Sequence, residues 1–378
     1  MFNATKIRLY PTDEQSIAFA KQFGCVRWVY NNALAECQTH YRETGKSLNY
    51  HALAVRLPKL KQEFEWLKEA DAQALQQSVK HLSRAFDNFF AKRGAYPTFK
   101  SKRDRQSFSY PQRVKFNGNR IYCPKVGWVK CVIHREMEGK LKTVTISRTA
   151  CGHFYASILR DDGLESPDVS CDGKVVGVDV GLSHLAITSD GVKIDNKRIV
   201  RKHARNLKRK QQKLSRKQKG SKRREKARRM VARVHERIAN ARKDHLHKVS
   251  RKIVNENQVI AVETLNIKGM TKNHNLAKSV LDAGWGMLSS FLEYKAARDG
   301  KLFLKIDRWL PSSKTCSSCG HVVRKIPLNV RSWSCTKCGA NHDRDVNAAI
   351  NIRDEAIRTI KAGGLPVSAS GGDVSHEV

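Results

Sequence analysis

Hydrophobic and polar residues near the start of the chain follow first the period of a strand and then the period of a helix. Thr5–Tyr10 alternates polar and apolar side chains, which is typical of a half-buried strand, and Pro11 ends it. Apolar residues then recur at helical spacing, which Gly24 interrupts without breaking. The spacing predicts three helices, over Asp13–Thr44, Asn49–Leu60 and Ala70–Phe90.

The pattern changes to short strands between Val114 and Arg160. Asn117–Gly118 favours a hairpin turn, and a set of short strands predicts a small barrel or sandwich. If Thr5–Tyr10 joins these strands, the helical block is an insertion into a β-domain. The acidic segment Asp161–Asp172 is expected to be a linker.

Two buried strands in the second half each end in an acid. Lys174–Gly191 predicts a hairpin whose first strand ends at Asp179, and the apolar run Val259–Glu263 predicts another strand. A carboxylate at the end of a buried strand is costly unless it binds a metal or hydrogen-bond donors. The alternative for Asp179 is a cap on the turn.

The chain after Glu263 predicts four further segments. They are a loop over Leu265–Asn275, a helix over Ser279–Gly300, a strand over Leu302–Asp307 and a last helix over Asp345–Ile360. Asp345 is expected at or near the N-cap of the last helix. The core candidates of the earlier helix are Leu281, Trp285, Leu288, Leu292 and Tyr294.

The pattern of elements predicts a multidomain α+β protein, and the composition predicts that it binds a polyanionic partner. The chain has 378 residues, 40% of them hydrophobic, and a formal net charge of +37. Such an excess indicates nucleic acid most simply. A membrane surface is the alternative, but no apolar run approaches ~18 residues. The N-terminus has no signal-peptide pattern, so a cytoplasmic protein is expected. In a cytoplasmic chain, ten cysteines suggest metal ligands before disulfides.

Basic residues are concentrated between Lys197 and Lys252, a segment that contains 25 Lys or Arg and only three acids. Gly220–Ser221 is expected to divide this segment into two helices, the second with an apolar stripe that predicts ordinary packing. Like charges at this density repel, so a bound polyanion would stabilise such a hairpin; a disordered basic arm is the alternative. Ala91–Ser107 predicts a basic loop in which Tyr96 and Phe99 could stack on bases.

Four cysteines have the spacing of a metal site. Cys316-x-x-Cys319 and Cys335-x-x-Cys338 are 15 residues apart, which suits one structural, tetrahedral zinc ion. A redox dithiol is the alternative, but redox sites carry one such pair near a βαβ pattern. His321 and His342 are expected at the surface or behind the ligands. The other cysteines are expected to be free thiols or small core residues: Cys25, Cys37, Cys123, Cys131, Cys151 and Cys171.

The acids predict hydrolytic chemistry. Asp179 and Glu263 end strands, and Asp343 and Asp345 follow the cysteines. Two Mg²⁺ ions held by three carboxylates can activate a water and neutralise the attacking and leaving oxygens of a phosphodiester. Asp179 is the expected bridging ligand. The order of a hairpin, a helical excursion, an acid-ending strand and a late helix is typical of an RNase H-like nuclease core.

Several stretches resemble the TnpB family, transposon-encoded RNA-guided DNA nucleases related to type V CRISPR effectors. They include GVDVGLSHLAITSDG, VIAVETLNIKGM, PSSKTCSSCG and HDRDVNAAINI, and the similarity also reaches FGCVRWVYNNAL and YPTFKSKR. The resemblance covers nearly the whole chain except its tail.

The resemblance implies an architecture of four domains and a disordered tail. A wedge β-barrel would span 1–10 and 95–172, interrupted by a helical recognition domain over 11–94. A RuvC-like α/β nuclease domain would span 173–310 and 341–362, interrupted by a zinc-binding target-nucleic-acid domain over 311–340, with the tail over 363–378. Asp179, Glu263 and Asp345 match the three RuvC acids, and Asp343 would be a neighbour.

The resemblance also implies an activity. A guide RNA from the transposon end would pair with double-stranded target DNA beside a short adjacent motif, and the Mg²⁺ site would cut the DNA; a monomer is favoured. An unguided transposase or resolvase, and an RNA-guided binder that represses transcription, are the alternatives. Candidates for the adjacent motif are Tyr50, Gln76, Gln77 and Lys80, although plain solvation also explains this polar face. Candidates for backbone contacts are Lys100, Lys102, Arg103, Arg205, Lys208 and Arg209.

Overall fold

The computed structural model describes residues 1–327 and 329–363 and forms two compact units, one from Met1 to Glu165 and one from Ser166 onward. Each unit contains helices and a sheet, so the chain is a multidomain α+β protein. The predicted disordered tail lies outside the described residues, apart from Gly363, which follows the last helix.

The first unit is built on a seven-stranded antiparallel sheet in the order β2-β6-β7-β1-β5-β4-β3. β1 pairs with both β5 and β7, so the prediction that the first strand joins the later ones is confirmed. The strands are β1 (Phe2–Tyr10), β2 (Gln106–Tyr110), β3 (Lys115–Asn117), β4 (Arg120–Cys123), β5 (Gly127–Val132), β6 (Lys140–Arg148) and β7 (Phe154–Asp161).

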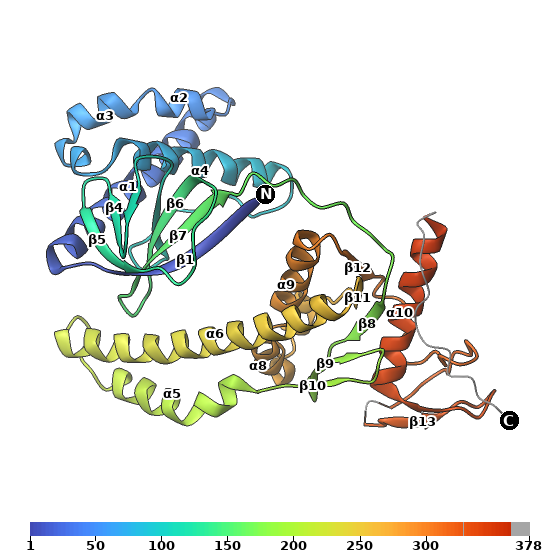
Figure 1. The fold of residues 1–378 in the computed structure, drawn as a ribbon. Helices are drawn as coiled ribbons and strands as arrows, with labels where there is room; N and C mark the ends of the chain where they lie inside the picture. The colour runs from blue at the N-terminus through green and yellow to red at the C-terminus, as the bar shows by residue number, and fades with distance from the viewer. Residues whose placement is uncertain (328, 364–378) are drawn as a thin grey trace. The chain divides into compact units, whose positions relative to one another are not determined.

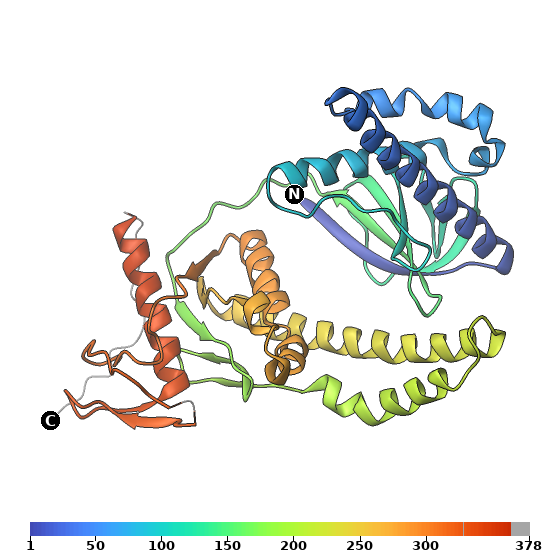
Figure 2. The ribbon, with the colours of Figure 1, turned by 180° about the vertical axis from the view of Figure 1, so that it is seen from behind.

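Helices inserted between β1 and β2 pack on this sheet. α1 (Asp13–Thr44) and α4 (Ala72–Phe90) lie along one face of it (Figure 2). The Phe23 ring of α1 lies 5.1 Å from that of Phe108 in β2, and the Phe19 ring lies 5.5 Å from that of Phe154 in β7. Helices and sheet therefore share one hydrophobic core.

The second unit is built on a five-stranded sheet in the order β10-β9-β8-β11-β12 (Figure 1). β8 (Val175–Asp179) is antiparallel to β9 (His184–Thr188) and parallel to β11 (Val259–Glu263), which is parallel to β12 (Leu302–Ile306). The predicted hairpin and both acid-ending strands are confirmed. β10 (Lys193–Asp195) lies at one edge, and β13 (Ser332–Ser334) pairs with β14 (Asn341–Asp343) in a separate small sheet.

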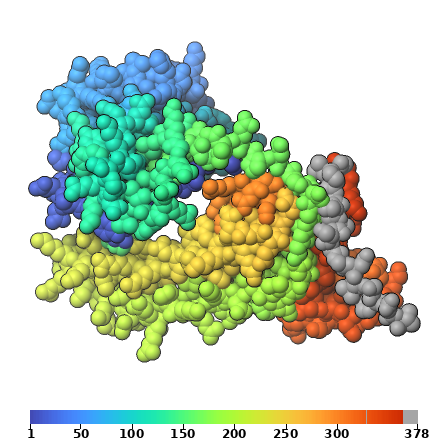
Figure 3. All heavy atoms as spheres, in the orientation of Figure 1, coloured from blue at the N-terminus to red at the C-terminus, as the bar shows by residue number. Residues whose placement is uncertain are grey.

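The basic segment forms a helical hairpin of α5 (Ile199–Ser215) and α6 (Lys222–Glu256), as predicted, and α5 packs beside the N-terminal half of α6 (Figures 1 and 3). Val234 and Ile238 of α6 pack against Ile199 of α5. The C-terminal half of α6 packs on the sheet with α9 (Trp285–Arg298). α10 (Arg344–Ala362) covers β8 (Figure 1).

Three predicted segments are divided differently. Asn49–Leu60 forms two short helices, α2 (Tyr50–Ala54) and α3 (Leu57–Glu63), and a 3-10 helix (Glu65–Glu69) follows. The division arises because Pro58 has no backbone N–H and fits only the first turn of a new helix. The predicted loop over Leu265–Asn275 contains α7 (Ile267–Met270) and the start of α8 (His274–Ala283).

Gly284 divides the helix predicted over Ser279–Gly300. Its φ of +73° ends α8, and α9 begins at the next residue. The break turns Leu281, on α8, out of the core, and Tyr294 also lies outside it; their exposed fractions are 60% and 46%. Their prediction as core residues is wrong, whereas Trp285, Leu288 and Leu292 are buried.

Candidate functional site

Asp179 and Glu263 end neighbouring strands of the five-stranded sheet. Val178 of β8 is in register with Val262 of β11, so the next residue on each strand is an acid. Paired residues on parallel strands point to the same face. The two carboxylates therefore lie side by side at the carboxyl edge of the sheet, which is where open α/β sheets bind ligands.

Asp345 reaches this edge because α10 crosses β8 at Gly177. A Cβ atom on Gly177 would lie 2.0 Å from the Ala349 oxygen and 2.5 Å from the Arg353 nitrogen, so only glycine permits this approach. Asp345 lies four residues before Ala349, which is about one helical turn toward the start of α10. The first turn of the helix is thus set beside the end of β8.

Asp343, and not Asp345, is the N-cap of α10. Its Oδ1 accepts hydrogen bonds from the backbone N–H groups of Asp345 (3.0 Å) and Val346 (3.1 Å). Its other oxygen, Oδ2, lies 2.6 Å from the Nζ of Lys193 in β10. The prediction that Asp345 lies near the N-cap is confirmed, and Asp343 fixes the turn that carries it.

The three carboxylates interact electrostatically. Burial, followed by the charges of Asp345 and Glu263, raises the pKa of Asp179 to about 7. Burial also raises the pKa of Glu263. For Asp343, burial favours the neutral acid, but the bonds from Lys193 and the helix N–H groups outweigh it and lower its pKa. Asp179 therefore lies at the centre of the negative charge, and a cation there would relieve both desolvation and repulsion.

Arg331 is a residue of this site that the sequence did not reveal. Its Nη1 lies 3.2 and 3.3 Å from the two carboxylate oxygens of Asp345. Its backbone oxygen accepts a hydrogen bond from the Arg344 N–H, which holds Arg331 beside the start of α10. Arg331 lies in the loop between the cysteine pairs, outside any periodic pattern, so only the fold brings it to Asp345.

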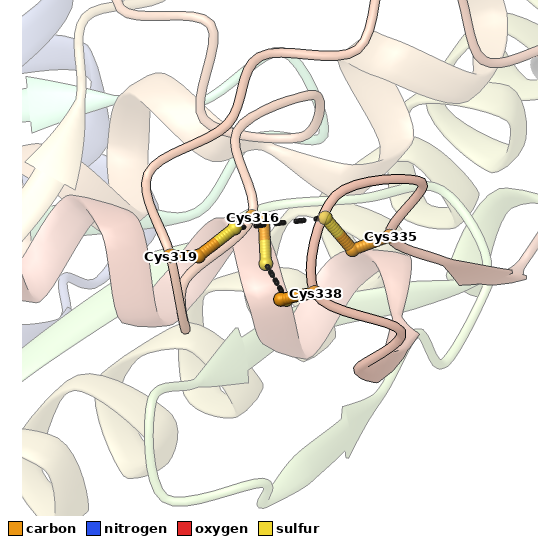
Figure 4. Close-up of side chains that lie close together, drawn as sticks. All are labelled: Cys316, Cys319, Cys335 and Cys338. Atoms are coloured by element: carbon orange, nitrogen blue, oxygen red, sulfur yellow. Dashed lines mark hydrogen bonds between the residues drawn. The ribbon is translucent and has the colours of Figure 1, made fainter.

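The four predicted cysteines converge, as Figure 4 shows, and their sulfur atoms all lie within 4.8 Å of one another. The Sγ atoms of Cys316 and Cys338 are 3.7 Å apart, and those of Cys319 and Cys335 are 3.6 Å apart. A tetrahedral ion with Zn–S bonds of about 2.3 Å requires S–S separations of about 3.8 Å. The cluster therefore fits one zinc ion.

Each cysteine pair forms the same tight turn. The N–H groups of Gly320 and Gly339 donate to the carbonyl oxygens of Cys316 and Cys335, both at 2.9 Å, and both glycines have φ of +72°. His342 lies behind the cluster, where its Nε2 is 3.0 Å from the Cys316 Sγ, in the position of a hydrogen-bond donor to a thiolate. The six other cysteines are buried, and none of them forms a disulfide bond among the described residues.

Two asparagines connect the cysteine module to α10. The Nδ2 of the buried Asn347 donates to the Thr315 oxygen at 2.7 Å, and its Oδ1 accepts from the Ser317 N–H at 2.9 Å. Asn351, one turn later, donates to the oxygens of Ser312 and Thr315, both at 2.7 Å. The loop before the first cysteine pair is therefore fixed to the helix that carries Asp345.

The candidate nucleic-acid residues of the first unit lie on several elements. Gln76 and Lys80 are exposed and Gln77 is half-buried on α4, and the exposed Tyr50 begins α2. Lys102 and Arg103 are exposed in the loop after α4. The Lys100 ammonium lies 3.5 Å from the centre of the Tyr30 ring, and burial there lowers its pKa.

The helical hairpin carries the candidates of the second unit. Arg205, Lys208 and Arg209 are exposed on α5. Arg209 also lines a groove of about 310 Å³ between the two helices, together with Asn206, Lys210, Met230, Arg233, Val234 and Arg237. Within the described residues, no helix is long and apolar enough to cross a membrane.

Three family profiles match the chain. Residues 160–274 match "Probable transposase", residues 285–352 match "Cas12f1-like, TNB domain", and residues 1–46 match "Helix-turn-helix domain". Residues 1–46 form one strand and one continuous helix in this structure, so the description "Helix-turn-helix domain" does not fit their fold.

Named relatives cover almost the whole chain. "Putative RNA-guided DNA endonuclease" of Streptomyces pristinaespiralis is 41% identical over 97% of this chain and 90% of its own length. The chain belongs to the TnpB family. "Putative RNA-guided DNA endonuclease InsQ" of Escherichia coli is 34% identical over 92% of this chain and 91% of its own length. "TnpB-like protein L79" of Acanthamoeba polyphaga mimivirus is 32% identical over 33% of this chain and 24% of its own length.

Among solved structures, "Cryo-EM structure of the Cas12f1-sgRNA-target DNA complex" aligns with 94% of this chain and 100% of its own chain, at 16% identity and a TM-score of 0.38.

Proposed function

We propose that this TnpB-family chain is an RNA-guided endonuclease. Its DNA-cutting site would be formed by Asp179, Glu263 and Asp345. The observation that carries the proposal is the meeting of these acids at one sheet edge, where burial and the charges of Asp345 and Glu263 raise the pKa of Asp179 to about 7. The names of the relatives that cover the chain supply the guide and the substrate class.

The three carboxylates fit Mg²⁺, which prefers oxygen ligands and keeps several of its waters. Asp179, Glu263 and Asp345 would hold two such ions, with Asp179 shared between them. Bound Mg²⁺ would supply an activated water and charge stabilisation for phosphodiester hydrolysis. The chain's own part is to orient the acids: Asp343 fixes the turn of Asp345, and Arg331 holds its carboxylate.

Zinc has a structural role in this proposal. Four thiolates leave no open position for a substrate, and Asn347 and Asn351 connect the cysteine module to α10. The residues over 311–340 form the proposed target-nucleic-acid domain, inserted into a RuvC-like domain over 173–310 and 341–362. The zinc module thereby helps to position Asp345.

The first unit supplies the proposed motif reader and the RNA contacts. The wedge domain (1–10 and 95–172) and the helical domain (11–94) are expected to read the adjacent motif through Gln76 and Gln77 on α4. Amide side chains can pair with adenine edges in the major groove, and the exposed Lys80 suits a phosphate. The α5–α6 hairpin is expected to bind guide RNA or heteroduplex by charge.

The decisive experiment expresses the chain with its native flanking DNA and sequences the nucleic acid that copurifies in high salt. A discrete RNA, followed by cutting of a plasmid that matches its guide segment, is the expected result. Asp179→Ala should abolish cutting and leave RNA binding intact. Asp190→Ala is the matched control, because this acid lies in the turn that follows β9 and forms its ion pair with Lys174, away from the three acids.

One observation favours a second function. The profile over 160–274 is described as "Probable transposase", which suits an unguided transposase or resolvase that uses the same acids. That function predicts heterogeneous, salt-sensitive nucleic acid in the purified protein and cutting that does not depend on a guide. A repressor without nuclease activity predicts guided DNA binding without cutting.

A further inference from the structure

Trp309 is the most exposed large hydrophobic side chain in the described residues, with an exposed fraction of 76%. A tryptophan ring in water leaves a large apolar surface unburied, which a soluble fold normally covers. Among the described residues, the guanidinium of the neighbouring Arg308 lies over this ring, 4.7 Å from its centre.

The backbone under Trp309 is firmly held. Its N–H donates to the Asp307 Oδ1 at 2.9 Å, and the Leu310 N–H donates to the Asp307 oxygen at 3.2 Å, which closes a turn. Leu310 then packs against the buried residues of the sheet and α10. The turn is therefore anchored on both sides and presents the indole ring to solvent.

This turn lies close to the three acids. Ile306, the last residue of β12, is in register with Glu263, and its oxygen accepts a hydrogen bond from the Thr264 N–H at 3.0 Å. Trp309 follows three residues later, within about 11 Å of chain length. A strand of nucleic acid whose phosphate reached Glu263 would pass the indole ring within a few nucleotides.

We propose that Trp309 stacks on an unpaired base of the DNA strand being cut and so positions that strand at the acids. The proposal rests on the proposed nuclease function. Aromatic rings bind single strands by stacking on bases, whatever their sequence, and an adjacent Arg adds a contact to a base face or a phosphate. A ring held by an anchored turn loses little entropy on binding, which suits a fixed platform.

The test uses the full chain with its copurified RNA and a target strand that carries 5-iododeoxyuridine at one position at a time. Asp179→Asn in this chain keeps the strand uncut during irradiation. We expect a crosslink to the tryptic peptide 309–314 from one or two positions near the cut site. Trp309→Phe should retain a crosslink, and Trp309→Ala should lose it.

Kinetics on the otherwise unaltered chain provide the second readout. Trp309→Ala should raise KM for the cut strand about 5- to 100-fold, as expected for one lost stack, and Trp309→Phe should recover most of that loss. The defect should persist at raised salt, because stacking is not screened as phosphate contacts are. Tyr294→Ala, which removes another exposed ring of the same unit, should leave KM unchanged.

Two results would overturn the proposal. One is crosslinking that maps only to other residues, with KM unchanged in Trp309→Ala. The other is a change in oligomeric state by light scattering in that variant without any effect on DNA, which would assign the ring to contact with a second copy. A wild-type chain that cuts no DNA would refute the proposed function instead, and the crosslink would still test the stacking.

Discussion

Gly177→Ala should separate α10 from β8 and thereby displace Asp345 from Asp179. The new Cβ would lie 2.0 Å from the Ala349 oxygen and 2.5 Å from the Arg353 nitrogen. These two atoms are the acceptor and donor of one intrahelical hydrogen bond, so the methyl group would press on the helix backbone and not on a flexible side chain.

The size of the displacement follows from contact distances. A carbon and a carbonyl oxygen approach to about 3.3 Å, so the helix must retreat by about 1.3 Å or tilt by an equivalent amount. Overpacking of this kind typically costs about 1–3 kcal/mol of unfolding free energy. Misplacement of a catalytic group by about 1 Å costs roughly 100-fold in rate. We therefore expect a larger loss of cleavage than of stability.

Cleavage rate and thermal unfolding should be measured on the same preparations. The expected result is at least a roughly 100-fold slower rate with a melting temperature lowered by about 2–12 °C. Gly24→Ala in α1 is the control: its Cβ would meet nothing within 4 Å, so this variant should be slightly stabilised and cut normally. Wild-type cleavage and melting in Gly177→Ala would refute the close crossing.

Three further predictions concern the acids and the zinc module. Because the pKa of Asp179 is raised to about 7, its ionisation destabilises the metal-free chain progressively as the pH rises from about 4 to about 7. Asp179→Asn should therefore raise the melting temperature at pH 8 more than at pH 5. Mg²⁺ bound at this site should stabilise the wild type and not the variant. An equal effect of the substitution at both pH values would contradict the assignment. Asp343→Ala should slow cleavage and cost about 0.5–2 kcal/mol, whereas Asp343→Asn should retain the cap and most of the rate; equal losses in cleavage assays would exclude the capping role. Cys335→Ser should lower the zinc content by metal analysis and destabilise the module, and an undiminished stoichiometry would count against four-thiolate binding.

Local patterns predicted the elements that carry the chemistry. Asp13–Thr44 and Val259–Glu263 have the predicted bounds. A long apolar periodicity indicates a helix, and a β-branched apolar run of five residues is too short for a helix and favours a buried strand. The spacing of the cysteines similarly predicted a cluster that the sulfur distances fit. In each case the signal lies within a few residues of the feature it predicts.

Features set by tertiary contacts could not be predicted in this way. Gly284 looks like a tolerated glycine within a helix, but its positive φ ends one helix and starts another. Arg331 reaches Asp345 only because its backbone is held beside the start of α10. The side-chain partner of Asp343 is Lys193, which lies 150 residues earlier in the chain.

The segment from Asp345 to Ala349 shows how one short motif serves three contacts. Asp345 faces the other acids, Asn347 satisfies backbone groups of the cysteine module, and Ala349 meets Gly177. Ala349 is fully buried, so a larger side chain there would overpack the interior, and an apolar residue at 347 would leave the Ser317 N–H without its acceptor. The acid, the amide and the small residue are therefore required together, because the same two turns of α10 contact the zinc module and the sheet.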